Sequence, residues 1–189
     1  MDSRSILNYV VMLFPLSEIV LLVFKRSKER ASAKKDRGSL QLLWLTILAS
    51  IGLTVILQWY PAWVIQFPKT IINVIALCLL IGGLLIRWIS IISLGKFFTV
   101  DVAIQQEHVL ILKGMYKYVR HPSYTGLLLE FVGLAVYFGT WISLIIIVIP
   151  ITSAIMYRIR CEEILLRETF GNQYEEYMAH TRSLIPGIV

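Results

Sequence analysis

The chain has 189 residues, of which 57% are hydrophobic and 16% are charged, and its mean hydropathy is +0.73. This composition excludes an ordinary soluble domain and indicates an integral membrane protein. Because one span takes roughly 20 residues, the length leaves room for about five spans and little else. The formal net charge of +6 is concentrated between Lys25 and Arg37. Between two apolar segments, such a basic run is typical of a cytosolic loop and not of a nucleic-acid-binding surface.

The first two spans are predicted at Ile6–Phe24 and Leu40–Tyr60. Within the first span, Pro15 predicts a kink, and Glu18 is an intramembrane acid with no evident partner in the sequence. The second span ends in an aromatic-rich segment that is typical of the membrane interface. We expect residues 1–69 to form a two-span hairpin with the basic loop in the cytosol. Five spans then place the amino terminus outside and the carboxyl terminus inside.

The third span is predicted from Thr70 to about Gly95, where Gly82-Gly83 permits close helix contact and Arg87 is expected to snorkel to the interface. The next apolar stretch, Gly126 to Tyr157, is too long for one straight helix across a core about 30 Å thick. Gly139-Thr140-Trp141 offers a break within it. The sequence therefore predicts a tight hairpin of two helices, which completes five spans.

A rigid polar segment, Arg120-His121-Pro122-Ser123-Tyr124-Thr125-Gly126, directly precedes this hairpin. Polar groups at the edge of a membrane cost free energy unless protein groups or a ligand satisfy them. Pro122 disfavours helical backbone at His121. We therefore predict a polar, non-helical site where the membrane meets water, on the cytosolic side.

Beyond the last span, Arg158 and Glu162 lie four residues apart and share one face of the predicted helix. Side chains at helical spacing then follow, namely Leu166, Phe170, Tyr174, Tyr177 and Met178. The pattern predicts that the last helix continues as an amphipathic helix lying on the membrane or on the loops. The histidines (His108, His121, His180) and the two cysteines have no zinc-ligand spacing, so no metal site is predicted.

These motifs combine in one order along the chain. They are Arg120-His121-Pro122-x-Tyr124-x-Gly126, a hydrophobic hairpin, Arg158-x-x-x-Glu162-Glu163, Phe170-Gly171-x-x-Tyr174-x-x-Tyr177 and a closing Ile185-Pro186. In this combination, roughly residues 85–189 resemble the isoprenylcysteine carboxyl methyltransferase family, in a short five-span form that suggests a prokaryotic member. The resemblance implies an all-α polytopic membrane bundle in which residues 70–189 form the methyltransferase catalytic region.

The resemblance also implies a cofactor, an acceptor and a set of site residues. The cofactor is S-adenosylmethionine, and the acceptor is the carboxylate of a prenylated cysteine or a similar lipid-bearing group that enters from the bilayer. Arg158 matches a position that contacts substrate, and Glu162 matches one that contacts cofactor. Gln105 and Gln106 are candidates for a cofactor-binding glutamine. The implied cofactor pocket is lined by His108, Val109, Leu110, Ile111, Tyr116, His121, Pro122, Ser123 and Tyr124.

The residue types suit this chemistry. A carboxylate is already ionised at neutral pH, so its methylation needs positioning and a water-poor pocket and does not need a general base. The guanidinium of Arg158 stays charged and grips two oxygens, and Glu162 suits the cofactor's ammonium group. Purely structural roles remain open for the same side chains. Arg158 could snorkel to the interface, and Glu162 could simply pair with Arg158. His121 could make a local hydrogen bond in a turn, and Tyr116 and Tyr124 could pack at the membrane interface.

Other functions fit parts of the pattern. A phospholipid N-methyltransferase differs only in its acceptor, and a nicotinamide-dependent reductase of sterol-like lipids shares the Arg-His-Pro-x-Tyr motif but has more spans. A non-enzymatic scaffold or small transporter is disfavoured, since polar residues gather on one side of the predicted membrane. Glu18 and Glu130 are intramembrane acids outside the family motifs and are left out of the predicted site.

Overall fold

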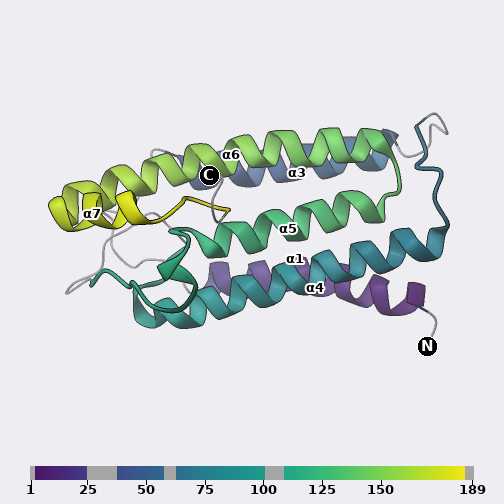
Figure 1. Cartoon of the computed structure of the whole chain (residues 1–189). Helices are drawn as coiled ribbons and strands as arrows, with labels where there is room; N and C mark the ends of the chain where they lie inside the picture. Colours follow the sequence, from purple (N-terminus) through teal and green to yellow (C-terminus); the bar gives the residue numbers. More distant parts are fainter. Residues whose placement is uncertain (1–2, 25–37, 58–62, 101–108, 186–189) are drawn as a thin grey trace.

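The computed structural model describes residues 3–24, 38–57, 63–100 and 109–185, and within these ranges it is helical, with two isolated β-bridges and no strands (Figure 1). The long helices are α1 (Ser3–Phe24), α3 (Ser39–Leu57), α4 (Lys69–Leu94), α5 (Pro122–Tyr137) and α6 (Trp141–Phe170), followed by the short α7 (Asn172–His180). Two 3₁₀ turns, η1 (Gly95–Phe97) and η2 (Gly114–Lys117), lie between α4 and α5. The predicted all-α bundle is confirmed. The basic segment Lys25 to Arg37 lies outside the described residues.

Three helices, α3, α4 (extended through η1) and α6, are long and apolar enough to cross a membrane. The apolar part of α1, Leu7–Leu21, is shorter, as is α5 with its 16 residues. Large aliphatic side chains are exposed on the outside of the bundle, such as Leu48 at 65% and Ile149 at 60%. Such a surface fits lipid rather than water. The number of spans, five, stays a prediction.

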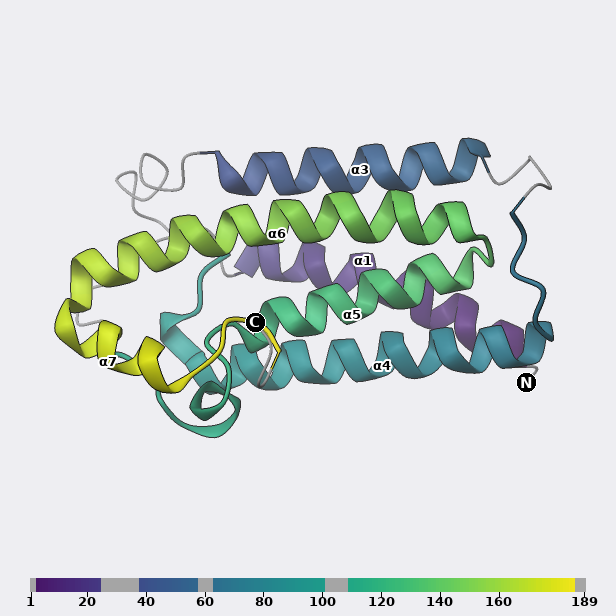
Figure 2. The ribbon, with the colours of Figure 1, turned by 45° about the horizontal axis from the view of Figure 1, so that its top comes forward.

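Helix α5 lies between the other long helices, with α4 along one side and α6 along the other (Figures 1 and 2). Helix α1 packs along α4, and α3 packs along α6. The contact of α4 with α5 is close because Gly83 faces Gly126: a Cβ at Gly83 would lie 2.6 Å from the Gly126 carbonyl oxygen. The predicted glycine contact is therefore confirmed for Gly83. At Gly82, an added Cβ would meet nothing described within 4 Å.

The hairpin of α5 and α6 turns where the sequence predicts a break. Helix α5 ends at Tyr137, and Gly139 adopts a φ of 69°, which favours glycine. The Thr140 side chain then caps α6 by accepting a hydrogen bond from the Ser143 amide at 3.1 Å. The start of the hairpin differs from the prediction, because α5 begins at Pro122 and not at Gly126. Proline suits the first helical position, since its missing amide hydrogen would have no partner there.

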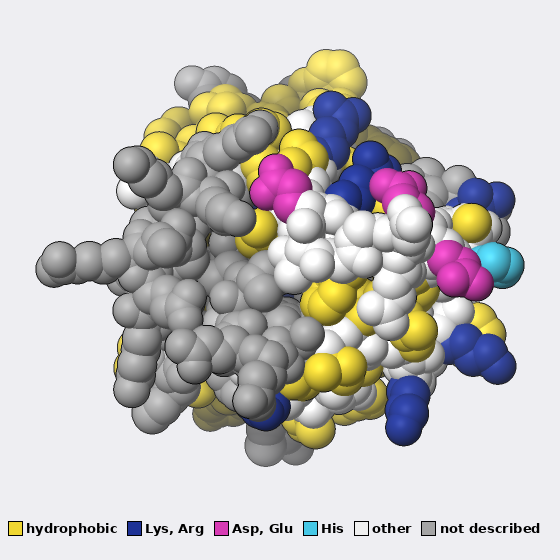
Figure 3. Space-filling model, turned by 90° about the vertical axis from the view of Figure 1, so that its left-hand side faces the viewer, with side chains coloured by type: hydrophobic (Ala, Val, Ile, Leu, Met, Phe, Trp, Pro, Cys, Tyr) yellow, Lys and Arg dark blue, Asp and Glu magenta, His cyan; other side chains and the backbone are white. Residues whose placement is uncertain are grey.

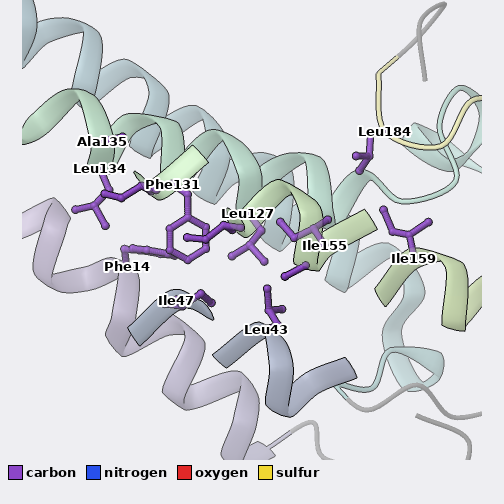
Figure 4. Packing of buried hydrophobic residues seen from close by; sticks show 13 residues of the cluster. Phe14, Leu43, Ile47, Leu127, Phe131, Leu134, Ala135, Ile155, Ile159 and Leu184 are labelled. Atoms are coloured by element: carbon purple, nitrogen blue, oxygen red, sulfur yellow. The ribbon is translucent and has the colours of Figure 1, made fainter. Parts of the chain in front are cut away.

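Apolar side chains from α1, α3, α5 and α6 form the main core (Figure 4). Phe14 of α1 and Phe131 of α5 meet edge to face, with ring centroids 5.1 Å apart at 84°. Ile47 of α3 and Ile155 of α6 belong to the same cluster. The core thus joins the first two long helices to the α5–α6 hairpin.

The prediction of one continuous helix after the last span is wrong at Gly171. Helix α6 ends at Phe170, and Gly171 has a φ of 52°, which lets the chain fold back into α7. Tyr174 and Tyr177 on α7 are buried against the protein, and the Tyr177 hydroxyl donates to the Tyr116 carbonyl at 2.6 Å. Helix α7 therefore covers the loops. Charged side chains of both signs gather at this end of the molecule (Figure 3).

Candidate functional site

The Arg120-His121 backbone is non-helical, as predicted. His121 has φ −125° and ψ 56° and precedes the first turn of α5. The chain after α7 satisfies the amides here: Arg120 N–H donates to the Arg182 carbonyl at 2.8 Å and His121 N–H donates to the Ser183 carbonyl at 3.0 Å. Buried backbone amides need such partners. The polar motif is thus held in place by residues far along the chain.

Glu163 on α6 joins the motif to that helix. Its Oε1 accepts from Arg120 Nε at 2.8 Å and lies 3.2 Å from His121 Nε2. Burial alone would raise the pKa of the Glu163 carboxyl, but the hydrogen bonds from His121 and Arg120 and their charges outweigh it, and the pKa falls to about 2. Arg120 also donates to the Thr181 carbonyl at 2.6 Å. A charged cluster therefore fixes the loop, α6 and the segment after α7 to one another.

A pocket, called here the polar pocket, opens beside this cluster with about 810 Å³ of empty space, including the part open to the outside. Its lining includes Tyr174 and Tyr177, so it lies at the end of the bundle where α7 folds over the loops. Its wall is formed by Leu94, Phe97, Phe98, Thr99, Leu110, Ile111, Tyr116, Arg120, His121, Ser123, Tyr124, Glu162, Leu165, Leu166, Tyr174 and Tyr177.

Most of the predicted cofactor residues line this polar pocket, including Leu110, Ile111 and Glu162. Val109 lies outside its lining, with 57% of its surface exposed. Pro122 is fully buried at the start of α5 and also lies outside the lining. His108, Gln105 and Gln106 lie outside the described residues.

Tyr174 is a pocket residue that the sequence reasoning assigned to helix packing. Its side chain is 1% exposed and lines the polar pocket, yet its hydroxyl has no hydrogen-bond partner among the described residues. Burial raises the pKa of this hydroxyl, so it keeps its proton at neutral pH. A buried hydroxyl without a partner costs free energy. The wall of the polar pocket thus includes a tyrosine whose buried hydroxyl has no partner among the described residues.

A second pocket, called here the apolar pocket, lies on the other side of Tyr124, with about 720 Å³ of empty space that includes its open part. Arg158 lies in this pocket and does not line the polar one. The wall consists of Phe14, Pro15, Glu18, Leu40, Leu43, Trp44, Ile47, Ile51, Arg87, Phe98, Thr99, Val100, Ser123, Tyr124, Leu127, Phe131 and Arg158.

Tyr124 separates and links the two pockets. Its hydroxyl accepts from Arg158 Nε at 2.9 Å and donates to Glu162 Oε2 at 3.0 Å. The guanidinium also donates to Ser39 Oγ at 2.9 Å and to the Val100 carbonyl. Arg158 is 2% exposed, so it does not snorkel. The predicted pair on one face of α6 therefore places one charge in each pocket, joined through a tyrosine hydroxyl.

Arg87 is also buried, and the expectation that it snorkels is wrong. Its Nε and Nη2 donate to the two carboxylate oxygens of Glu18 at 2.5 and 2.6 Å, and its Nη1 donates to the Ser123 carbonyl at 3.2 Å. Glu18 thus has the partner that the sequence could not name. Glu130 is fully buried, and neither of its oxygens has a hydrogen-bond partner within the described parts of the chain.

The structure therefore defines an integral membrane helical protein in which a polar and an apolar pocket adjoin and share the lining residues Phe98, Thr99, Ser123 and Tyr124. A family model described as the isoprenylcysteine carboxyl methyltransferase (ICMT) family matches residues 74–168. A protein-S-isoprenylcysteine O-methyltransferase B of Arabidopsis thaliana is 30% identical over 175 residues, covering 87% of this chain and 89% of that protein. The chain belongs to the isoprenylcysteine carboxyl methyltransferase family.

One further relative and one solved structure show how much of the chain is similar to known proteins. A probable protein-S-isoprenylcysteine O-methyltransferase of Oryza sativa subsp. indica is 32% identical over 119 residues, which is 62% of this chain and 62% of that protein. The solved structure of a eukaryotic intramembrane Ras methyltransferase, ICMT, matches with a TM-score of 0.60 and 27% identity, covering 76% of this chain and 52% of that one. This chain thus spans 62% of the rice relative and about half of the solved chain.

Proposed function

We propose that this protein transfers a methyl group from S-adenosylmethionine to the carboxylate of a prenylated cysteine or a similar lipid-bearing acceptor. The observation that carries the proposal is the placement of Arg158 in the apolar pocket and Glu162 in the polar pocket, joined by the Tyr124 hydroxyl. Names of the relatives, which are protein-S-isoprenylcysteine O-methyltransferases, support the same activity.

Residues of the polar pocket suit S-adenosylmethionine. The Glu162 carboxylate would accept hydrogen bonds from the ammonium group of the cofactor, and the Tyr174 hydroxyl, which has no partner among the described residues, would hydrogen-bond a polar edge once the cofactor is bound. Leu110 and Ile111 offer apolar contact for a base. When bound, S-adenosylmethionine supplies an electrophilic methyl group on a sulfonium sulfur, which needs no acid to leave.

On the other side of Tyr124, Arg158 would hold the acceptor carboxylate. The guanidinium is fixed by Tyr124 and Ser39, so its position does not have to be ordered when the acceptor binds. These existing hydrogen bonds also leave the grip on the carboxylate partial, which preserves the nucleophilicity of the oxygen. The apolar walls exclude water from the reacting oxygen. The role of the protein is thus alignment of the carboxylate with the methyl group.

The acceptor would remain in the bilayer while the cofactor enters from the cytosol. A prenyl chain buries many CH₂-equivalent groups at about 0.8 kcal/mol each, so leaving lipid for water would be costly. The apolar pocket takes part of its wall from α1 and α3, whose outer faces carry exposed aliphatic side chains. Cysteine-accessibility labelling tests the orientation: the polar pocket end should react from the cytosolic side.

Methyl transfer from labelled S-adenosylmethionine to N-acetyl-farnesylcysteine tests the reaction itself. We expect incorporation as a base-labile methyl ester with the purified protein in nanodiscs. Incorporation into the amine of phosphatidylethanolamine, and none into the prenylcysteine, would instead identify a lipid N-methyltransferase. Stabilisation by NADPH with no effect of S-adenosylmethionine in a thermal-shift assay would point to the reductase alternative.

A further inference from the structure

The apolar pocket takes a large part of its wall from α1 and α3, two helices that lie outside the matched segment 74–168. The residues concerned are Phe14, Pro15 and Glu18 of α1 and Leu40, Leu43, Trp44, Ile47 and Ile51 of α3. The core cluster in Figure 4 contains three of these side chains, Phe14, Leu43 and Ile47. Almost half of the pocket wall therefore comes from the amino-terminal helices, outside the matched segment.

The pocket extends along the bundle from the charged end inward. Arg158 lies at its charged end and donates a hydrogen bond to Ser39, the first residue of α3, which directly precedes the lining residue Leu40. Along α3, lining side chains continue from Leu40 to Ile51, a rise of about 16 Å at 1.5 Å per residue. Along α5, they continue from Ser123 to Phe131, a rise of about 12 Å. The space is thus long in the direction that a hydrocarbon chain would follow away from a clamped carboxylate.

Two aromatic rings lie where the α5 part of the wall ends: Phe131 is the last lining residue of α5, and Phe14 of α1 packs on it. Phe14 and Phe131 are 7% and 1% exposed and pack edge to face. Beyond them, Leu134, Ala135 and Ile147 are buried in the same cluster. Figure 4 shows Phe14 reaching from α1 toward Phe131 on α5. A chain that enters from Arg158 therefore meets the two rings before any further space.

We propose that Phe14, packed on Phe131, sets the longest hydrocarbon chain that the acceptor pocket admits. The inference rests on the proposed function, since it assigns the apolar pocket to the acceptor's lipid. The two packed rings form the floor of the pocket, and a close-packed floor does not accommodate extra methylene groups without strain. Removing a ring from such a floor leaves an apolar cavity, and cavities of this kind stay dry and take up apolar groups. The length of the acceptor's hydrocarbon chain is thus selected by α1, a helix that carries none of the site residues Arg120, His121, Arg158 and Glu162.

The test compares S-geranyl, S-farnesyl and S-geranylgeranyl N-acetylcysteines as acceptors, with kcat/KM measured for each in nanodiscs. We expect Phe14→Ala to raise the ratio of geranylgeranyl to farnesyl efficiency about tenfold, the equivalent of one to two additional buried CH₂ groups. Phe14→Leu should shift the same ratio in the same direction by less. Ile51→Trp, which places a larger side chain on the α3 part of the pocket wall, should shift the preference toward the shorter geranyl acceptor.

Leu21→Ala is the matched control. Leu21 is a buried apolar residue on the same helix that does not line the pocket, so its truncation should lower thermal stability and leave the chain-length ratios unchanged. If wild-type protein methylates none of the prenylcysteines, the proposed function fails. If it methylates them and the efficiency ratios of Phe14→Leu and Ile51→Trp equal those of wild type, the proposed function stands. The assignment of Phe14 as the limit on chain length is then wrong. Phe14→Leu keeps a large apolar side chain and Ile51→Trp adds volume to the wall, so these two variants decide the matter even if Phe14→Ala does not fold.

Discussion

The polar and apolar pockets differ in where along the chain their walls come from. The polar pocket is built from Leu94 and residues that follow it, in the connection between α4 and α5, the motif segment, α6 and α7. The apolar pocket also recruits α1 and α3, so its wall extends from Phe14 to Arg158. Chemistry that needs particular donors at particular spacing leaves a pattern in the sequence. A lipid-shaped space is made by packing and leaves little pattern, which is why only the first pocket could be anticipated.

The largest expected effect concerns the ion pair in the apolar pocket wall. Glu18→Gln leaves the Arg87 guanidinium uncompensated in a buried place, which should cost about 3–5 kcal/mol of stability. The double variant Glu18→Leu/Arg87→Leu removes both charges and should recover most of this loss. Thermal unfolding in one detergent measures both. An unchanged Tm for Glu18→Gln would mean that the pair does not hold α1 to α4.

Arg158→Ala should lower kcat/KM for the prenylcysteine about 100-fold, because a hydrogen-bonded charge at the carboxylate is lost. Arg158→Lys should recover only part of this loss, since the forked geometry is absent. The affinity for S-adenosylmethionine should change little, because Arg158 lies in the apolar pocket. Near-normal efficiency of Arg158→Ala would refute the carboxylate clamp and make Arg120 the next candidate.

Glu162→Ala tests the other side of Tyr124. Loss of its carboxylate from the polar pocket should weaken S-adenosylmethionine binding about tenfold in calorimetry, while the protein stays folded. Glu176→Ala, at an exposed position on α7, serves as the control and should bind as wild type does. Equal affinity in Glu162→Ala and wild type would leave Glu162 as a structural partner of Tyr124.

The smallest effect is a pH dependence of the charged cluster beside the polar pocket. The pKa of Glu163 is lowered from its ordinary value of 4.5 to about 2, so its stabilising contribution is fully present above about pH 4.5 and is lost as the pH falls toward 2. Wild type should exceed Glu163→Gln in Tm by about 3 °C at neutral pH, and the difference should shrink below pH 4.5. A difference that stays constant down to pH 3, or grows, would contradict the ion-pair account.

The sequence predicted the helices and the hairpin well because hydrophobic runs and Gly139 act locally. It placed the charged pair Arg158 and Glu162 on one face because helical spacing decides that. It could not tell that Tyr124 stands between them, since that depends on the packing of α5 against α6.

Three features of the structure could not be predicted from the sequence, because each depends on the tertiary fold. Helix α7 folds back at Gly171 because glycine permits a positive φ, although the apolar spacing continues across it. Arg87 is paired with Glu18, 69 positions away in the chain, and no periodicity carries such information. Ser39 reaches Arg158 from 119 positions away. Long-range polar pairs are set by the tertiary fold, and only their chemical types are visible beforehand.

The hydrogen bonds between Arg120-His121 and Arg182-Ser183 also bear on the order of events during synthesis. The residues that supply these carbonyls follow α6 and α7 in the chain, so they are synthesised after all the long helices. Until residues 181–184 arrive, the amides of Arg120 and His121 and the hydroxyl of Thr125 lack the carbonyls they use in the folded protein. A chain that stops at His180 would therefore contain all the long helices and still lack the partners of these two amides. The backbone of the Arg120-His121 segment thus depends on the last-made of the described residues.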